Sequence, residues 1–215
     1  MIGLFDSGSG GINTVRYIKE ISDDTDLVYL IDRANAPYGT RSKRELISIT
    51  ERNINELSCM GAERVLIACC TASTVYPYVG EKYKSISVPI IGAAANEAKR
   101  LTRTGRIGVI ATKRTVKSHA FKRALPDLCV LEYALSELVP LIDSGLSDGT
   151  VTDDDKKMLE AILRPVLRKR IDTLVLGCTH FPSLKRTISE IAREYGVKET
   201  VDTALVGARL IIGQK

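Results

Sequence analysis

The sequence lacks the features that define several common protein classes. No apolar run approaches the ~20 residues that a membrane-spanning helix needs. Residues 1–6 contain no basic segment leading into a long apolar stretch, so we expect no signal peptide and a cytoplasmic protein. Neither a Cys-x-x-Cys pair nor a closely spaced pair of histidines is present, which argues against a zinc site. Five cysteines are odd in number and sparse, which argues against a disulfide scaffold and predicts free thiols.

The composition that remains is that of a globular chain. Hydrophobic residues make up 44% of the 215 positions, which is too apolar for a disordered chain and enough for a buried core in one or two domains. Lys and Arg number 31 against 26 Asp and Glu, a net charge of only +5. The densest basic run, residues 164–170, has the spacing of an exposed helix face. We therefore expect neither a nucleic acid nor a membrane as a partner.

Short apolar runs alternate with amphipathic stretches along the chain. Strands are expected at residues 2–5, 27–31, 65–68, 89–91, 106–111, 128–133 and 173–176. Helices are expected at residues 12–21, 43–60, 152–169 and 183–195, with Thr152 as an N-cap. Strands separated by helices indicate parallel βαβ units, so the predicted class is α/β, with mainly parallel sheets flanked by helices.

Two of the predicted strands end in a similar motif. One motif is Ala68-Cys69-Cys70-Thr71 and the other is Gly177-Cys178-Thr179. Each has a small residue, then a cysteine, then a threonine one or two positions later. This weak internal repeat suggests two similar α/β lobes with the active site between them. We assign residues 1–92 plus 183–215 to the first lobe and 93–182 to the second. Ligands of parallel sheets bind at the carboxyl ends of the strands, so these motifs are candidates for a site.

Four residues at these strand ends have side chains suited to acid–base chemistry. Cys69 and Cys178 are expected at helix N-termini, where unpaired N–H groups favour a thiolate. His180 lies two residues after Cys178, and a Cys–His pair can act as a nucleophile or as an acid–base couple. Asp6 ends the first strand and could reach the Cys69 loop as an orienting group or proton acceptor.

The remaining candidates have simpler interpretations. Residues 8–11 form a glycine-rich turn that could bind a phosphate or a carboxylate, or be only a tight turn; no Gly-Lys-Ser/Thr follows, so it is not a Walker motif. Most free cysteines are small core residues, and we interpret Cys59 and Cys129 in that way. His119 lies in a basic helical stretch and is read as a surface residue.

Seven segments carry a resemblance to a known family. They are residues 2–11, Pro37-Tyr38-Gly39, 68–73, 88–92, 107–112, 138–142 and 174–182. In this order, and over nearly the whole chain, they resemble glutamate racemase, within the wider aspartate/glutamate racemase superfamily. The two cysteine motifs joined to Asp-Ser-Gly at the first strand end are the most specific part of the match.

The resemblance implies a cofactor-independent racemase that interconverts L- and D-glutamate and supplies D-glutamate for peptidoglycan. In such an enzyme Cys69 and Cys178 act on opposite faces of the α-carbon, with Asp6 supporting the first and His180 the second. An acidic amino acid is then the small-molecule partner, and a homodimer is the expected assembly. The substrate-binding residues that it implies are Ser7, Pro37, Tyr38, Gly39, Cys70, Thr71, Ser73, Thr112, Thr115 and Thr179.

Several positions depart from the family pattern. The family usually has Asn where this chain has Cys70, and a thiol is a weaker hydrogen-bond donor than an amide. Residues 93–96 read Ala-Ala-Ala-Asn in place of an Ile-Glu-Pro-like segment, Leu135-Ser136 replaces a Cys-Pro pair, and Asp143 replaces Glu. Aspartate or another acidic amino acid as substrate, and a catalytically weak ligand-binding homologue, therefore stay open as alternatives, as does a Cys69–Cys70 disulfide. A thiol hydrolase using Cys178 and His180 is a weaker alternative.

Overall fold

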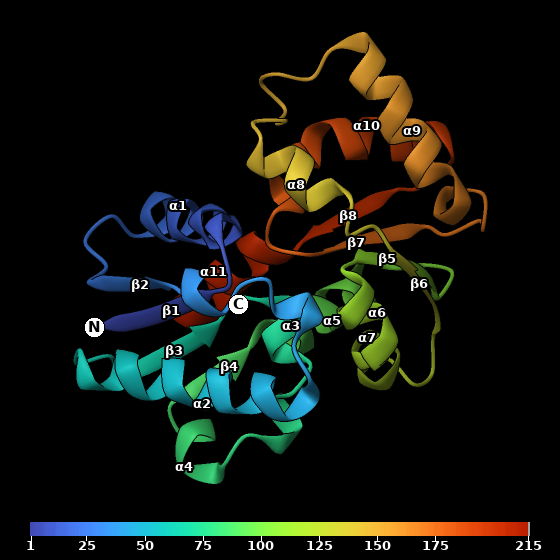
Figure 1. The fold of residues 1–215 in the computed structure, drawn as a ribbon. Helices are drawn as coiled ribbons and strands as arrows, with labels where there is room; N and C mark the ends of the chain where they lie inside the picture. Colours follow the sequence, from blue (N-terminus) through green and yellow to red (C-terminus); the bar gives the residue numbers. More distant parts are fainter. Residues whose placement is uncertain (215) are drawn as a thin grey trace.

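The fold consists of two four-stranded parallel sheets. We describe residues 1–214 of a computed structural model (Figure 1). The strand order is β2-β1-β3-β4 in the first sheet and β6-β5-β7-β8 in the second, and every neighbouring pair is parallel. The strands are β1 (Ile2–Asp6), β2 (Leu27–Ile31), β3 (Arg64–Ile67), β4 (Ser87–Pro89), β5 (Arg106–Ala111), β6 (Cys129–Ala134), β7 (Thr173–Gly177) and β8 (Glu199–Asp202). The predicted α/β class is confirmed.

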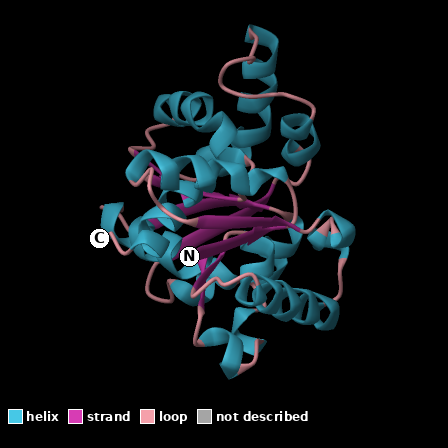
Figure 2. Cartoon of the chain, turned by 90° about the vertical axis from the view of Figure 1, so that its left-hand side faces the viewer, coloured by secondary structure: helices cyan, strands magenta, loops and turns pink. Residues whose placement is uncertain are grey.

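Helices connect the strands and enclose the sheets (Figure 2). The α-helices are α1 (Ile12–Ile21), α2 (Lys43–Cys59), α3 (Cys70–Ser73), α4 (Glu81–Lys84), α5 (Ile90–Leu101), α6 (Lys113–Ser118), α7 (Ala120–Ala124), α8 (Leu138–Asp143), α9 (Asp153–Leu167), α10 (Lys185–Glu194) and α11 (Thr203–Ile212). The 3-10 helices are η1 (Ser9–Gly11), η2 (Arg33–Asn35), η3 (Tyr38–Thr40), η4 (Tyr76–Tyr78) and η5 (Phe181–Leu184). No helix within residues 1–214 is long and apolar enough to cross a membrane.

Both faces of each sheet are covered, as unbroken apolar strands require. In the first sheet, Leu4 and Leu66 pack with Ile18 of α1 and with Ala208 and Ile211 of α11. The opposite face of that sheet packs against the apolar side of α2. In the second sheet, α9 and α10 cover one face, while α5 and α7 cover the other.

The helix starts follow the expected capping chemistry. Thr152 caps α9 as predicted: its hydroxyl accepts a hydrogen bond from the Asp155 backbone N–H at 3.2 Å, and the Asp155 carboxylate accepts one from the Thr152 N–H at 3.0 Å. Ser42 and Glu45 form the same reciprocal capping box at the start of α2. Each box satisfies two N–H groups that a helix leaves without partners. Arg168, Lys169 and Arg170, which directly follow α9, are exposed, as expected for a solvated basic run.

Two parts of the predicted organisation differ from the structure. Ile90 and Ile91 begin helix α5 instead of continuing a strand, because with Ala94, Ala95 and Ala98 they form one buried face at helical spacing.

The second difference concerns the lobe boundary. The predicted first lobe included all of residues 183–215, yet β8 pairs with β7 in the second sheet and α10 packs against α9. Residues 185–202 therefore belong with the second sheet, and only α11 returns to the first. The return after β8 is fixed locally by Asp202, whose carboxylate caps α11 by accepting from Ala204 N–H at 2.9 Å.

Candidate active site

A cavity of about 370 Å³ lies where the carboxyl ends of strands from both sheets meet. Strands β1 and β3 of the first sheet and β5 and β7 of the second each end at this cavity, as expected for a ligand site in parallel sheets. The predicted site residues that line it are Ser7, Pro37, Tyr38, Gly39, Cys69, Cys70, Thr71, Thr112, Cys178, Thr179 and His180. The two cysteine loops, 109 positions apart in the chain, therefore form one site.

Cys69 lies at the entrance of α3 with its side chain buried. Its Sγ is 3.7 Å from the hydroxyl of Ser7, which follows the neighbouring strand β1. Burial raises the pKa of the Cys69 thiol well above its ordinary value, and the nearby Asp6 carboxylate raises it further. The free site therefore holds Cys69 as a thiol.

Cys178 lies after β7 and is also buried. Its Sγ is 3.7 Å from Nδ1 of His180, which confirms that the two residues adjoin. Burial raises the pKa of Cys178 to about 12. The backbone N–H groups of His180 and Phe181, which hydrogen-bond to the sulfur, lower that pKa only in part.

Backbone N–H groups at both helix entrances lower the pKa of the thiol, as expected, but they do not outweigh burial in the free site. Helix α3 is a single turn of four residues, and the loop after Cys178 enters the 3-10 helix η5, with α10 beginning only at Lys185. Such short turns carry little of the dipole of a long helix. Desolvation of the buried sulfur atoms is the larger effect.

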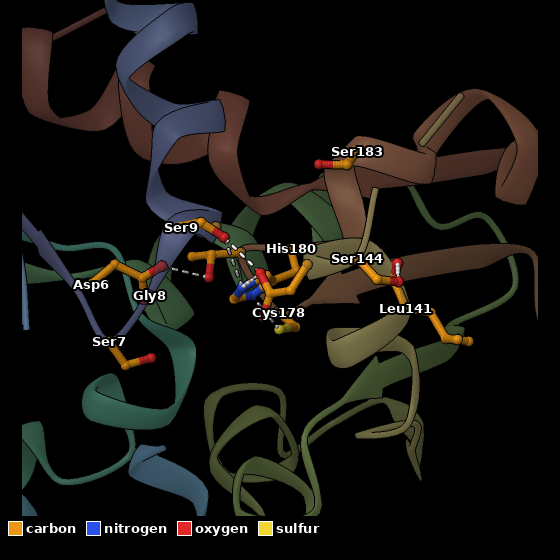
Figure 3. A network of polar contacts seen from close by, with 12 residues as sticks. Asp6, Ser7, Gly8, Ser9, Leu141, Ser144, Cys178, His180 and Ser183 are labelled. Atoms are coloured by element: carbon orange, nitrogen blue, oxygen red, sulfur yellow. Dashed lines mark hydrogen bonds and ion pairs between the residues drawn. The ribbon is translucent and has the colours of Figure 1, made fainter. Parts of the chain in front are cut away.

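His180 connects Cys178 to a second polar group on the other side of its ring (Figure 3). Its Nε2 lies 3.3 Å from Oδ1 of Asp143, at the end of α8. The same carboxylate oxygen accepts a hydrogen bond from the hydroxyl of Ser9 at 2.7 Å. The result is a chain of polar contacts from Cys178 through His180 to Asp143, completed by Ser9 from the first lobe. A carboxylate on the far ring nitrogen orients an imidazole.

Asp6 does not line the cavity but lies behind it, fully buried. Its Oδ2 accepts a hydrogen bond from the hydroxyl of Thr179 at 2.9 Å, and its Oδ1 has no partner within residues 1–214. Burial raises the pKa of Asp6, an effect reduced by the positive charge of His180 when protonated and by hydrogen bonds from Thr179 and Cys69. Asp6 therefore adjoins both cysteine loops rather than the Cys69 loop alone.

Two other predicted residues lie outside the cavity wall. The hydroxyl of Ser73 donates to the carbonyl of Ile67 at 3.1 Å and accepts from the N–H of Ile90 at 3.2 Å, which ties β3 to α5. Thr115 is buried, with its hydroxyl 3.0 Å from that of Thr112. Thr115 thus supports Thr112, which lines the cavity, whereas Ser73 joins two elements outside it.

The glycine-rich turn provides close contact between the lobes. A Cβ on Gly10 would lie 2.6 Å from Oγ1 of Thr179 and 2.8 Å from the backbone nitrogen of His180, closer than atoms can approach. The side-chain amide of Asn13 donates to the carbonyls of Thr179 at 3.0 Å and Gly10 at 3.2 Å. Glycine is therefore required here so that the Cys178 loop can lie against the first lobe. The structure thus gives this turn a role in close packing, which is not among the roles expected from the sequence.

Tyr38 and Cys70 also differ in how they face the site. The Tyr38 hydroxyl donates to Asp32 at 2.7 Å and accepts from the amide of Asn53 at 2.8 Å, so it already has partners on the protein. Cys70 packs among the apolar residues of α5 while reaching the cavity wall.

Within residues 1–214, no group of three or more His, Cys, Asp or Glu is placed to hold a metal ion.

Several cavity residues are not among the predicted ones. Ser9 and Asp143, which complete the histidine chain from outside the cavity, are also not among them, and the only signal for Ser9 is its polar side chain inside the glycine turn. Lys113 and Arg114 follow β5 directly, so the rule that selected the cysteine loops applies to them too. The others that line the cavity are Thr40, Ser136, Val139 and Pro140.

Comparison with known proteins places this chain in a family. Residues 12–211 match the model of the Asp/Glu/Hydantoin racemase family. A glutamate racemase from Desulforudis audaxviator is 40% identical over 195 residues, covering 88% of this chain and 70% of that protein. A glutamate racemase isoform from Bacillus anthracis superposes with a TM-score of 0.88 at 28% identity, covering 99% of this chain and 80% of the other. The Francisella tularensis glutamate racemase, solved in complex with D-glutamate, gives a TM-score of 0.84 at 28% identity over 99% of this chain and 79% of that one.

Proposed function

The chain belongs to the Asp/Glu/Hydantoin racemase family, and we propose that it interconverts L- and D-glutamate with Cys69 and Cys178 as its two proton-transferring groups. The observation that carries this proposal is that two buried thiols, one from each lobe, line the same cavity. Racemisation needs a proton to leave one face of the α-carbon and another to arrive on the opposite face. Two groups supplied by different lobes can act on the two faces, whereas a single base fixed on one side reaches only one face.

The proton transfers balance within this pair. As one thiolate takes the α-proton, an S–H bond forms and the electron pair of the broken C–H bond stays on the α-carbon. The opposite thiol then donates its proton to the other face, which leaves it as the thiolate. The substrate is inverted and the two sulfur atoms have exchanged protonation states, so the same machinery serves both directions.

Each thiol has a neighbour that can accept its proton. The pKa of Cys178 is high, so its thiol needs a nearby proton acceptor to form a thiolate. His180 can be that acceptor, because its Nδ1 lies 3.7 Å from the sulfur and Asp143 orients its ring. For Cys69 the corresponding group is Asp6, whose pKa is raised by burial, which makes its carboxylate a stronger base than an exposed one. The substrate ammonium adds a positive charge beside the sulfur atoms, which favours a thiolate.

Hydroxyl and backbone donors would hold the substrate and its transition state. Ser7, Thr71, Thr112 and Thr179 come from four different strand ends and all line the cavity. Negative charge that develops from the α-carbon onto the carboxylate is stabilised by donors fixed before the reaction begins. The hydroxyls of Thr71 and Thr112 lie 3.0 Å apart, so a hydrogen bond between them fixes their positions before a substrate binds.

D-Glutamate made by this reaction would serve peptidoglycan synthesis. A reducing cytoplasm suits chemistry that depends on free thiols. We also propose the homodimer that the family resemblance implies.

Removal of each thiol tests the mechanism. We expect Cys69→Ser and Cys178→Ser to lose about 100-fold or more of the glutamate racemisation rate, because a serine hydroxyl is a far weaker acid and base than a thiol. Cys59 and Cys129 are exposed, so the interpretation of both as core residues is wrong. Cys129→Ser and Cys59→Ser are therefore matched controls, since both thiols also lie outside the cavity. Turnover is followed by circular dichroism, and α-proton exchange by NMR in deuterated water. Full activity in either cavity variant would exclude the two-thiol mechanism.

A panel of acidic amino acids tests the substrate. Glutamate is expected to exchange its α-proton fastest. Faster exchange of aspartate would replace glutamate as the substrate while keeping the mechanism. Absence of exchange with every member of the panel would instead indicate a ligand-binding homologue.

A further inference from the structure

A groove of basic residues adjoins the active-site cavity. It has a volume of about 460 Å³ and its charged lining residues are Lys43, Lys113, Arg114, Lys117 and Arg123, all of them cations. Lys113 and Arg114 line both the groove and the cavity, as does Gly39. Cys69 and Cys178 line the cavity alone. The side of the cavity that borders the groove is therefore its positively charged side.

Arg114 differs from its cationic neighbours in its surroundings. Lys43 stacks over the ring of Tyr78 at 3.1 Å, and Arg123 donates to the carbonyl of Ser118. Lys113 and Lys117 are exposed and can be hydrated. Arg114 is half-buried, its Nε is shielded from solvent, and within residues 1–214 no hydrogen-bond acceptor reaches that atom.

A buried guanidinium N–H without an acceptor is unfavourable, because most buried polar groups in proteins have a partner. No carboxylate of the described chain lies within ion-pair distance of Arg114. The guanidinium is planar and presents paired donors that match a carboxylate. A carboxylate bound in the cavity would supply the acceptor that the protein does not.

We propose that Arg114 selects for acidic amino acids by binding the side-chain carboxylate of the substrate. This inference rests on the proposed function and names a residue that determines its specificity. The α-carbon has to lie between the two thiols, whereas Arg114 lies where the cavity meets the groove. The distal carboxylate, rather than the one on the α-carbon, therefore points toward Arg114. Cys70, on the cavity wall, is a poor substitute for such a donor because a thiol binds a carboxylate weakly.

Kinetics with Arg114 variants test this role. In Arg114→Ala and the longer neutral variant Arg114→Gln, we expect KM for glutamate to rise about 10- to 100-fold, the usual effect of losing a hydrogen bond to a charged group. We expect kcat to change less, because the contact is distant from the reacting carbon. Arg114→Lys should recover part of the affinity, since it restores the charge without the paired donors. The rate ratio of glutamate to glutamine should fall in the neutral variants.

Lys117→Ala is the matched control. Lys117 lies one turn further along α6 and lines the groove but not the cavity, so its removal should leave KM unchanged. An unchanged KM and an unchanged glutamate-to-glutamine ratio in both neutral Arg114 variants would overturn the inference, as would a loss confined to kcat. A thermal melt of each variant separates these results from misfolding.

Failure of the proposed function is distinguishable from failure of this inference. If the wild-type protein catalyses no α-proton exchange, the racemase proposal fails, and calorimetric binding of glutamate then decides the role of Arg114. Binding at least 10-fold weaker in Arg114→Gln than in the wild type would support the inference. Equal binding, or no binding of glutamate by the wild type, would overturn it.

Discussion

The two cysteine loops are alike in position and different in surroundings. Each cysteine follows a central strand of a parallel sheet, is buried, and has a raised pKa because its sulfur is removed from water. Cys69 has the hydroxyl of Ser7 and the carboxyl of Asp6 as polar neighbours. Cys178 has an imidazole, His180, backed by Asp143. The scaffold is repeated, but the polar group beside each thiol is not.

This difference is chemically reasonable for a racemase. The two enantiomers of a substrate do not make mirror-image contacts in a chiral site, so the two proton transfers need not have equal barriers. The equilibrium constant of racemisation is one, which forces kcat/KM to be equal in both directions whatever the barriers are. Any asymmetry between the thiols therefore has to be sought in the individual steps and not in the overall rate.

Replacement of His180 should have the largest effect. In His180→Asn the side chain stays polar but cannot accept and return a proton, so we expect kcat/KM to fall by about 100-fold or more. The fall should be the same for L- and D-glutamate. With α-deuterated substrates, the isotope effect should grow for the enantiomer whose C–H bond Cys178 breaks and shrink for the other, because the step at Cys178 has become slowest.

His119→Asn provides the control for this experiment. His119 is the other histidine of the chain and pairs with Glu132 at 2.9 Å, and it does not line the cavity. Its replacement should leave both isotope effects unchanged. Equal isotope effects for the two enantiomers in His180→Asn would show that the imidazole does not serve one thiol more than the other.

The sequence predicts the two thiol positions well because they depend on local pattern. Residues 65–68 and 173–176 are short apolar runs, and parallel strands bring their carboxyl ends to one edge. The strand β8 is not predicted because Glu199–Asp202 has one apolar residue, Val201, and no alternation. Its partner β7, distant in sequence, makes it a strand.

Contacts between lobes are the part of the site that local pattern does not reveal. The contact of Ser9 with Asp143 joins residues 134 positions apart, and it depends on how the sheets are packed. The size of the burial effect on the thiols cannot be read from the sequence for a related reason. Helix position can be read from sequence, whereas the burial that raises their pKa values follows from packing of the whole fold.

Stability at high pH should detect the buried thiol directly. The pKa of Cys178 is raised from an ordinary value of 9.0 to about 12 in the folded protein. Below pH 9 the thiol is protonated in both states and its burial costs no ionisation. As pH rises above 9 the unfolded chain releases this proton first, so the free energy of unfolding falls until the folded thiol also ionises. Linkage gives a loss of about 1.4 kcal/mol between pH 8 and pH 10.

Denaturant unfolding of matched variants isolates this contribution. The difference between pH 8 and pH 10 should be smaller in Cys178→Ser than in the wild type by about 1.4 kcal/mol, since tyrosines and lysines are common to both. Cys69→Ser should show a change of the same sign, because burial raises its pKa too. Cys129→Ser, which removes an exposed thiol, should behave as the wild type does. Identical pH dependence of the free energy of unfolding in all four proteins would mean that neither cavity thiol is desolvated, and that burial does not raise the pKa of either one.

The smallest effect is expected at the outer end of the histidine chain. Asp143 contacts His180 at 3.3 Å, but 48% of its side chain is exposed, so water and salt screen its charge. Asp143→Asn keeps the acceptor for Ser9 and should lower kcat/KM only about 2- to 5-fold, consistent with less than ~1 kcal/mol for an exposed pair. The deficit should narrow further as salt is raised toward 1 M, where the screening length is about 3 Å. A loss as large as that of His180→Asn, insensitive to salt, would instead make the carboxylate an essential partner of the imidazole. The asymmetry between the two thiols would then depend on a charged pair rather than on the histidine alone.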